Sequence, residues 1–241
     1  MVCGGKSGAM SVPATSIHPL DRPIWSALTS RQQSLAEGAG RARRYPPAIA
    51  PFADLADMSA ESFAELAALL SGSELAVLFT REPVTAPADF KILLAETGEQ
   101  MIGTPAESVV GGVEPVTLGA DDVPAMMALT ELTKPGPFSA RAPELGTFLG
   151  IRIDGQLVAM AGERMKPANY TEMTAVCVHP DYRGRGYAQV LLGAVARQIS
   201  ARGELPFLHV FSHNSSAIAL YQRQGMEIRR RIHVTVLQKQ T

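Results

Sequence analysis

Cysteine is scarce in this sequence: Cys3 and Cys177 are the only two in 241 residues, so no disulfide framework can form. One tryptophan and an aromatic content of 6% leave the core mainly to aliphatic side chains. No run reaches the about 18 apolar residues that a membrane helix needs, and the opening Met-Val-Cys-Gly-Gly-Lys lacks the apolar core of a signal peptide. We therefore expect a protein of a reducing, cytoplasmic compartment with no membrane partner.

Neither basic nor acidic residues are in excess. The 22 basic and 23 acidic residues give a net charge of −1, which gives no support for a nucleic-acid partner. The five histidines form no ligand-spaced motif with the cysteines, so no metal site is predicted. A Gly-x-x-x-x-Gly-Lys-Ser/Thr phosphate-binding loop does not occur anywhere in the sequence.

The composition otherwise suits a folded protein of one or two domains, with 46% hydrophobic and 19% charged residues. We expect a flexible arm over residues 1–20, an N-terminal domain over 21–110 and a second domain over 111–241. In the first half the pattern predicts a helix over 23–45, with Arg41, Arg43 and Arg44 at its C-terminal end. A second helix follows Ser59, and strands are predicted at 75–79 and around 101–102.

The second half has clearer signals. Asp154-Gly155 between two apolar runs predicts a hairpin of strands 147–153 and 156–160. Further strands are predicted at 116–118, 171–178, 207–211 and 227–237, and helices at 120–132, 186–202 and 215–224. The arginines at 229–231 are interpreted as a solvated face of the last strand. The predicted fold class is α/β (α+β), with a mixed central sheet flanked by helices.

A glycine-rich turn stands between the predicted strand 171–178 and the following helix, with the sequence Val178-His-Pro-Asp-Tyr-Arg-Gly-Arg-Gly-Tyr-Ala188. Two glycines let the backbone approach a ligand closely, and the N–H groups of the new helix can then bind a phosphate. Two arginines can add charge-assisted hydrogen bonds. A dinucleotide-binding turn would need a third glycine where Gln189 stands and an acidic residue at a strand end, whereas Glu204 lies in a loop.

Within this turn, Arg183-Gly-Arg-Gly-Tyr-Ala188 resembles the Arg/Gln-x-x-Gly-x-Gly/Ala signature of the GNAT superfamily of N-acetyltransferases. The stretch Asn214-Ser-Ser-Ala-Ile-Ala-Leu-Tyr-Gln-Arg-Gln-Gly-Met226 is similar to the second signature of that family. The resemblance covers about residues 114–240 and implies a GNAT fold, with acetyl-CoA as cosubstrate. The first half has the order of elements of a degenerate copy of the second.

The resemblance also implies which residues hold the cofactor. The turn would bind the pyrophosphate, and main-chain groups at the end of strand 171–178 would pair with the pantetheine arm, where strands 171–178 and 207–211 splay apart. The expected cofactor-binding residues are Val176, Cys177, Val178, Arg183, Gly184, Arg185, Gly186, Tyr187, Ala188 and Asn214. Cys177 is then a wall or core residue, since no motif places a base beside it.

Acetyl transfer to an amine needs the amine to be neutral, and an amine with a pKa of about 10.4 is mostly protonated at pH 7. Glu172 is the candidate base, because the histone-acetylating branch of the family has a glutamate at the corresponding place. The alternative for Glu172 is a solvent-facing strand residue, and Glu163 competes with it for the proton. Tyr221 is the candidate acid for the departing thiolate, with a packing role as its alternative.

By position, the acceptor would lie near Thr133, Phe138, Arg141 and Glu163. The predicted activity is transfer of an acetyl group from acetyl-CoA to an amine by direct attack, without a metal. The acceptor is a small-molecule or peptide amine, and amino acids, polyamines, drugs and protein termini all stay open. The alternative function is a non-catalytic acyl-CoA-binding sensor or interaction module.

Overall fold

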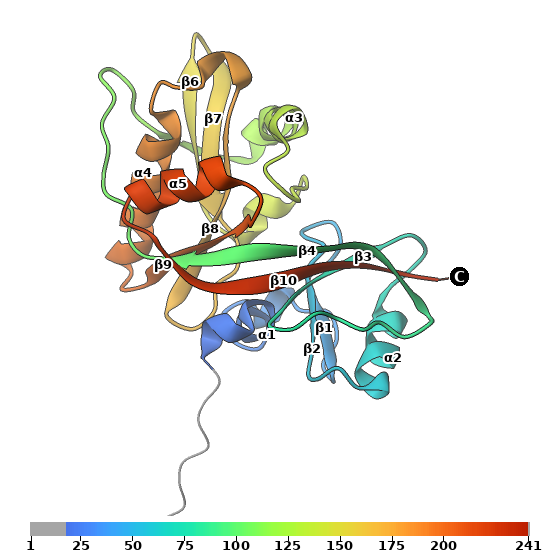
Figure 1. Cartoon of the computed structure of the whole chain (residues 1–241). Coiled ribbons are helices and arrows are strands. Elements are labelled where there is room, and N and C mark those ends of the chain that lie inside the picture. The colour runs from blue at the N-terminus through green and yellow to red at the C-terminus, as the bar shows by residue number, and fades with distance from the viewer. Residues whose placement is uncertain (1–17, 241) are drawn as a thin grey trace, which may run out of the picture.

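A single eight-stranded sheet organises the molecule in the computed structural model, which describes residues 18–240 (Figure 1). The strands follow one another in the order β3-β10-β4-β9-β8-β7-β6-β5. Neighbouring strands are antiparallel except β8 and β9, which are parallel. The sheet is therefore mixed, with helices packed against it, as the fold-class prediction states.

The first half of the chain contains short helices and four of the strands. Its elements are the 3₁₀ turns η1 (Pro19–Asp21) and η2 (Gln33–Leu35), the helices α1 (Pro23–Leu28) and α2 (Ala60–Leu69), and the strands β1 (Ala42–Arg44), β2 (Ala53–Leu55), β3 (Leu75–Thr80) and β4 (Phe90–Ile102). β1 and β2 form a small separate sheet. Most of the predicted arm over residues 1–20 lies outside the described residues; within it, Leu20 is buried.

The second half contains the elements that the sequence predicts. They are β5 (Val116–Leu118), η3 (Ala120–Asp122), α3 (Val123–Thr133), η4 (Ala142–Leu145), β6 (Phe148–Ile153), β7 (Gln156–Glu163), β8 (Tyr170–Val178), η5 (Pro180–Tyr182), α4 (Tyr187–Ala201), β9 (Leu205–Phe211), α5 (Ser215–Arg223) and β10 (Glu227–Lys239). The hairpin around Asp154-Gly155 is confirmed, with β6 and β7 paired on either side.

The predicted helix over residues 23–45 is wrong beyond Leu28. The chain turns after α1, and Gly38 takes a left-handed φ of +84°, which an α-helix cannot contain. Ala42 and Arg44 then pair with β2 and point to its buried side, and Arg44 is held by Glu37 and Glu74 rather than by a helix end. The second predicted helix is confirmed as α2, and its Ser59 caps it by accepting the Ser62 N–H at 3.3 Å.

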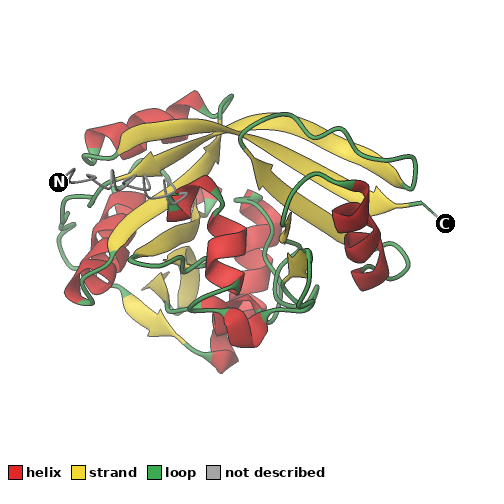
Figure 2. Ribbon diagram, turned by 90° about the horizontal axis from the view of Figure 1, so that it is seen from below, coloured by secondary structure: helices red, strands yellow, loops and turns green. Residues whose placement is uncertain are grey.

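β4 joins the two halves of the chain into one sheet. It runs for 13 residues between β10 and β9, and β3 pairs with the other edge of β10. Residues on both sides of the predicted boundary at 110/111 are thus hydrogen-bonded to one another, while the division into domains stays a prediction. Figure 2 shows these long strands extending toward the C-terminus of the chain, where α2 lies against them.

The arginines at 229–231 are not a uniformly solvated face, so that interpretation is wrong. A bulge between Ile228 and Arg230 interrupts the pairing of β10 with β4. Arg229 donates to Asp21 at 2.6 Å, and the Arg230 Nη1 lies 3.2 Å from the same carboxylate. Arg231 is more exposed and pairs with Glu99 of β4. These ion pairs tie the N-terminal segment to the last strand.

The main core lies between α4 and the strands beneath it. Leu191, Leu192, Val195 and Ile199 of α4 are fully buried against Val158 and its neighbours on β7, at the helical spacing that the sequence shows. Burying side chains of this size stabilises the fold by about 1.5–3 kcal/mol each. This packing fixes the N-terminus of α4 beside the C-terminal end of β8, where the glycine-rich turn lies.

Candidate active site

The parallel strands β8 and β9 separate part-way along their length. They pair only over Tyr170–Glu172 and Leu205–Phe207. Beyond that point β8 has a bulge, with a register shift opposite Met160 and Gly162 and a φ of +52° at Ala175. The predicted splay between the two strands is therefore present, and the edge of β8 that faces β9 is open beyond Glu172.

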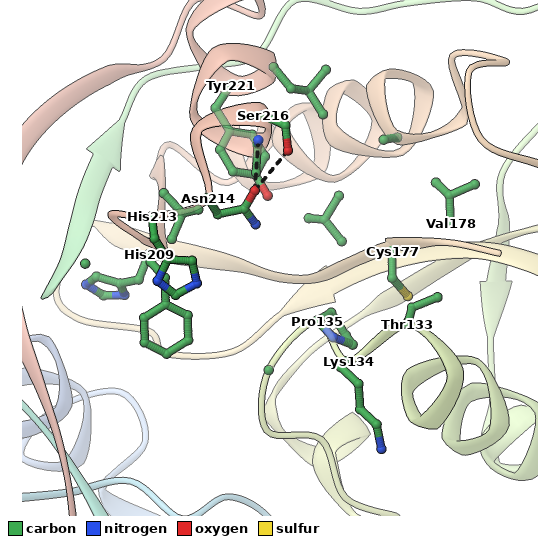
Figure 3. A pocket seen from close by; sticks show the side chains of 18 of the residues that line it. Thr133, Lys134, Pro135, Cys177, Val178, His209, His213, Asn214, Ser216 and Tyr221 are labelled. Atoms are coloured by element: carbon green, nitrogen blue, oxygen red, sulfur yellow. Dashed lines mark hydrogen bonds between the residues drawn. The ribbon is translucent and has the colours of Figure 1, made fainter. Parts of the chain in front are cut away.

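A cavity of about 870 Å³ occupies the splay and continues past it. Four sets of elements line it (Figure 3). The end of β8, the glycine-rich turn and the start of α4 contribute Val176, Cys177, Val178, Tyr182, Arg183, Gly184, Gly186, Tyr187, Ala188 and Gln189. α5 and the loop before it contribute His213, Asn214, Ser216, Ala217, Leu220, Tyr221 and Arg223, and the end of α3 contributes Thr133–Pro137.

The fourth set comes largely from strands outside the motifs. It comprises Phe52, Val77, Phe79, Leu94, Gly98, Arg164, His209, Val210, Phe211, Val234 and Val236. Most of these residues belong to β3, β4, β9 and β10. No motif marks them, because their approach depends on the pairing of β4 and β3 with β10.

The glycine-rich turn has the geometry of an anion-binding site. Gly184 and Gly186 have φ values of +77° and +80°, a conformation that L-residues with side chains rarely adopt. Within residues 18–240, no hydrogen-bond acceptor pairs with the N–H groups of residues 184–188. A Cβ on Gly186 would approach the Val110 side chain at 3.0 Å, so the turn is also too close to its neighbouring segment for a side chain. The turn fits a pyrophosphate at a helix N-terminus.

The two arginines of the turn differ. Arg183 lines the cavity. Arg185 lies outside its lining, stacks 4.9 Å from the centre of the Tyr182 ring and donates to the Asp181 carbonyl at 3.2 Å. The expected cofactor-binding role is therefore better placed at Arg183 than at Arg185.

α5 carries the second motif into the cavity wall. Asn214 caps the helix by accepting the Ala217 N–H at 3.2 Å and the Ser216 hydroxyl at 3.1 Å (Figure 3). Tyr221, two turns further on, is 8% exposed, and burial raises its pKa to about 12. Burial likewise raises the pKa of Cys177 to about 11, which disfavours a thiolate there.

Glu172 is fully buried, so the alternative of a solvent-facing strand residue is wrong. Its carboxylate accepts two hydrogen bonds from Arg164, at 2.6 and 2.8 Å, and its Oε1 lies 2.7 Å from Nδ1 of His209. Burial alone would raise the pKa of Glu172, but the Arg164 charge and the hydrogen bonds outweigh it and hold the pKa at about 2. Arg164 and His209 line the cavity, whereas Glu172 lies behind them.

Both ring nitrogens of His209 are engaged. Nδ1 faces Glu172, and the Gln100 amide nitrogen lies 3.0 Å from Nε2. That amide also donates to the Leu20 carbonyl at 2.8 Å, which fixes the amide beside the ring. His209 therefore presents the face of its ring to the cavity rather than a free lone pair.

Of the four residues expected near the acceptor, only Thr133 lines the cavity. Phe138 packs edge-on against Phe148 at 5.5 Å, and Arg141 pairs with Glu144 at the surface. Glu163, the competing base, is buried and pairs with Lys166 and Arg202. The structure does not bring these three residues to the cavity; their contacts are those of structural residues.

Comparisons with known proteins decide the family. Residues 148–234 match the FR47-like protein family. The N-alpha-acetyltransferase RimI of Mycobacterium tuberculosis is 33% identical over 138 residues, which is 50% of this chain and 85% of that protein. The chain belongs to the GNAT superfamily. Like these relatives, it is an N-acetyltransferase.

Solved structures extend the likeness to the whole fold of this GNAT protein. A GNAT-family acetyltransferase from Novosphingobium aromaticivorans is 42% identical, with a TM-score of 0.86, over 93% of this chain and 100% of that chain. A GCN5-related N-acetyltransferase from Kribbella flavida shares the fold, with a TM-score of 0.61 and 18% identity over 90% of this chain and 96% of that one. The likeness thus includes the residues before 111, which carry no GNAT motif.

Two further features bear on what the GNAT site can hold. Over residues 18–240, no group of three or more histidine, cysteine, aspartate or glutamate side chains is arranged to hold a metal ion. Within the same range, no helix is both long and apolar enough to cross a membrane. The expectation of a cytoplasmic compartment stays a prediction.

Proposed function

We propose that this chain transfers the acetyl group of acetyl-CoA to a primary amine by direct attack, with both substrates bound in the cavity between β8 and β9. GNAT acetyltransferases use acetyl-CoA, which supports that donor. The observation that carries the proposal is the continuity of one cavity. It runs from the glycine-rich turn, past Tyr221, to side chains of β3, β4 and β10.

The donor would lie along the motifs. The free N–H groups of residues 184–188 and the Arg183 side chain would hold the pyrophosphate. The open edge of β8 at Val176–Val178 would pair with the amides of the pantetheine arm, since no strand occupies that edge. Asn214 holds the start of α5 so that Tyr221 faces the same cavity.

Tyr221 would serve the leaving group. As the amine nitrogen bonds to the acetyl carbon, the carbon–sulfur bond breaks and the thiolate accepts a proton from the Tyr221 hydroxyl. Because burial raises the pKa of Tyr221 to about 12, the side chain is fully protonated at neutral pH and can donate. The proton lost by the amine goes to water, and solvent returns a proton to Tyr221.

Glu172 would act as a positioning residue instead of touching the amine. A carboxylate with a pKa of about 2, already bound to Arg164 and His209, has little tendency to take a proton at neutral pH. It holds those two side chains in the cavity wall. The role of Glu172 as the base, expected from the sequence, is the less well supported of the two.

The acceptor class is broad at this level: a small-molecule or peptide primary amine. The name of the mycobacterial relative, an N-alpha-acetyltransferase, adds an α-amine as one candidate acceptor. An α-amine has a pKa of about 7.7–8.0, so a large share of it is neutral near pH 7.5 without an enzymatic base.

Ligand binding tests the proposal, with thermal shifts measured for acetyl-CoA, CoA and NAD in parallel. At about 100 times its dissociation constant, a ligand stabilises the fold by roughly 2.7 kcal/mol. We expect a shift with both CoA species and none with NAD. A thermal shift with NAD alone, or the absence of a shift with all three ligands, would contradict the proposal.

Two matched variants sharpen this test. Gly186→Glu should abolish acetyl-CoA binding, because it strains the backbone at a φ of +80° and brings a carboxylate to the turn that would hold the pyrophosphate. Gly203→Glu is the control: its φ of +75° imposes similar backbone strain just beyond the other end of α4, with nothing within 4 Å of its Cβ. If both variants bind acetyl-CoA equally well, the turn is not the donor site. Turnover on amines separates the enzyme from a non-catalytic acyl-CoA-binding module.

A further inference from the structure

An apolar surface forms one wall of the cavity, away from both GNAT motifs. Val77, Val236 and Leu94 stand side by side on β3, β10 and β4, and Phe79 stands beside Val234 in the next row. All five line the cavity, and because side chains alternate along a strand, they share one face of the sheet. These five residues are called the apolar platform below.

Aromatic groups close the platform at its edge. Phe52 packs against Phe79 with ring centres 5.3 Å apart. The centre of the His209 ring lies 4.6 Å from that of Phe79. The Arg164 guanidinium lies 4.4 Å from the centre of the Phe52 ring. The acceptor end of the cavity thus has apolar and aromatic walls, with the Arg164 guanidinium beside them.

The charges around the cavity restrict what can lie on this platform. Across the described residues 18–240, the lining includes no aspartate or glutamate. Its charged side chains are Lys134, Arg164, Arg183 and Arg223. An acceptor with a second ammonium group would lose water and find no carboxylate in return, which is strongly unfavourable.

An anionic group on the acceptor is disfavoured for a different reason. Arg164 is the cation that stacks at the platform edge, and Glu172 already neutralises it through two hydrogen bonds. At the platform edge, a carboxylate on the acceptor would therefore meet a neutral ion pair and would still lose its hydration. An uncharged body avoids both costs and gains from contact with the platform.

We propose that the acceptor is a primary amine whose body is uncharged and apolar, aromatic or branched aliphatic, and that this body lies on the apolar platform. The inference rests on the proposed function and narrows it. It disfavours polyamines and other polycations, and it assigns an acceptor-binding role to residues of β3, β4 and β10.

A matched panel of amines tests the inference. We compare kcat/KM for 2-phenylethylamine, 1,5-diaminopentane and phenylalanine, which differ in a second cation and in an added carboxylate. We expect 2-phenylethylamine to exceed 1,5-diaminopentane by about 10- to 100-fold, the range expected for burying one large apolar group. It should exceed phenylalanine by at least about 10-fold, because the added carboxylate loses its hydration. Equal rates, or a preference for the diamine or for phenylalanine, would overturn the inference.

Two neighbouring residues of β4 provide a variant and its control. Leu94→Asp places a carboxylate on the platform and should reduce the preference for 2-phenylethylamine over the diamine by at least about 10-fold. Leu93→Asp adds the same charge at the adjoining residue, whose side chain is 44% exposed and lies outside the cavity lining, and should leave the preference unchanged. Leu94→Asn, which is neutral, should weaken 2-phenylethylamine without favouring the diamine.

The outcomes separate the inference from the function beneath it. Acetyl-CoA binding, measured by thermal shift, reports whether each variant is folded. Turnover with the diamine preferred would leave the enzyme intact and overturn the acceptor class. Acetyl-CoA binding without turnover on any amine would contradict the proposed function, and the acceptor class with it.

Discussion

Glu172 carries its negative charge at a position with no exposed surface, and Arg164 is its main partner. Replacing it by glutamine would leave the guanidinium buried without a counter-charge. We expect Glu172→Gln to lower the free energy of unfolding by about 3–5 kcal/mol. The surface pair of Arg141 and Glu144 is the control, and Glu144→Gln should leave the free energy of unfolding nearly unchanged. Denaturant titration measures both, and equal losses would contradict the buried role.

The same carboxylate gives stability a pH dependence. The pKa of Glu172 is about 2 in the folded chain against its ordinary value of 4.5, so the carboxylate's contribution is complete above about pH 4.5 and is lost as the pH falls toward 2. The contribution at neutral pH is about 3 kcal/mol by this linkage. The difference in unfolding free energy between wild type and Glu172→Gln should narrow between pH 6 and about pH 3. A constant difference across that range would contradict the assigned pKa.

Kinetics at the residue scale distinguish a positioning role from a base. If the amine must arrive neutral, kcat/KM rises with pH up to the pKa of the acceptor itself. The inflection should therefore move when 2-phenylethylamine is replaced by an amine of lower pKa. An inflection that stays fixed across acceptors and disappears in Glu172→Gln would restore Glu172 as the base.

Tyr221 is predicted to act on the leaving group alone. Tyr221→Phe keeps the packing of the ring and removes the hydroxyl, so kcat should fall by about 10²-fold or more, with little change in acetyl-CoA affinity. Pre-steady-state acetyl transfer and a binding titration measure the two quantities. An unchanged kcat would show that the thiolate needs no proton from Tyr221.

Residues of the motifs could be identified from the sequence, because each motif is local. Gly186 predicts a turn and Asn214 predicts a helix cap, each from its own residue type. Helical spacing from Asn214 then predicts the position of Tyr221. Arg164 and Phe52 had no such signal. They reach the cavity only because the loop after β7 and the segment before β2 fold against β8 and β3, which no short stretch of sequence encodes.

At the scale of elements, strong local signals gave correct bounds and weak ones did not. Asp154-Gly155 and the periodicity of α4 fixed a hairpin and a helix. β4 was predicted only at its last residues, since Glu99 and Gln100 read as polar although both are buried. Their partners come from distant elements: Arg231 donates to Glu99, and Arg229 donates to Gln100.

α4 offers a prediction against ordinary helix propensity. Replacing a glycine within a helix by alanine usually raises the free energy of unfolding by about 1 kcal/mol. At Gly193, however, a Cβ would lie 2.9 Å from both the Ala106 carbonyl oxygen and the Glu107 Cα, so the segment beside the helix would have to move. We expect Gly193→Ala to lower the free energy of unfolding. A gain of about 1 kcal/mol would show that this segment yields freely.

For the whole molecule, the position of β4 between β10 and β9 matters most. Motifs occur only after residue 178, and they give no sign that a strand from the first half lies inside the sheet. Strand pairing over more than 100 residues of sequence has no local signature, which is why two domains were expected. The platform of the acceptor end exists only because the two halves share this sheet.

That shared sheet predicts cooperative unfolding of the full chain. Trp25, the only tryptophan, reports on the first half by fluorescence, and amide exchange in α4 reports on the second. Both probes should give one transition with the same denaturant midpoint. Separate midpoints would show that residues 21–110 and 111–241 unfold as independent domains.

Acetyl transfer itself is the most direct measurement: the release of free thiol from acetyl-CoA when 2-phenylethylamine is added, with the acetamide identified by its mass. We predict release that depends on the amine and matches the acetamide formed mole for mole. It should be lost in Gly186→Glu and kept in Gly203→Glu. Thiol release that ignores the amine, or none at all while acetyl-CoA binds, would contradict acetylation of an amine in this cavity.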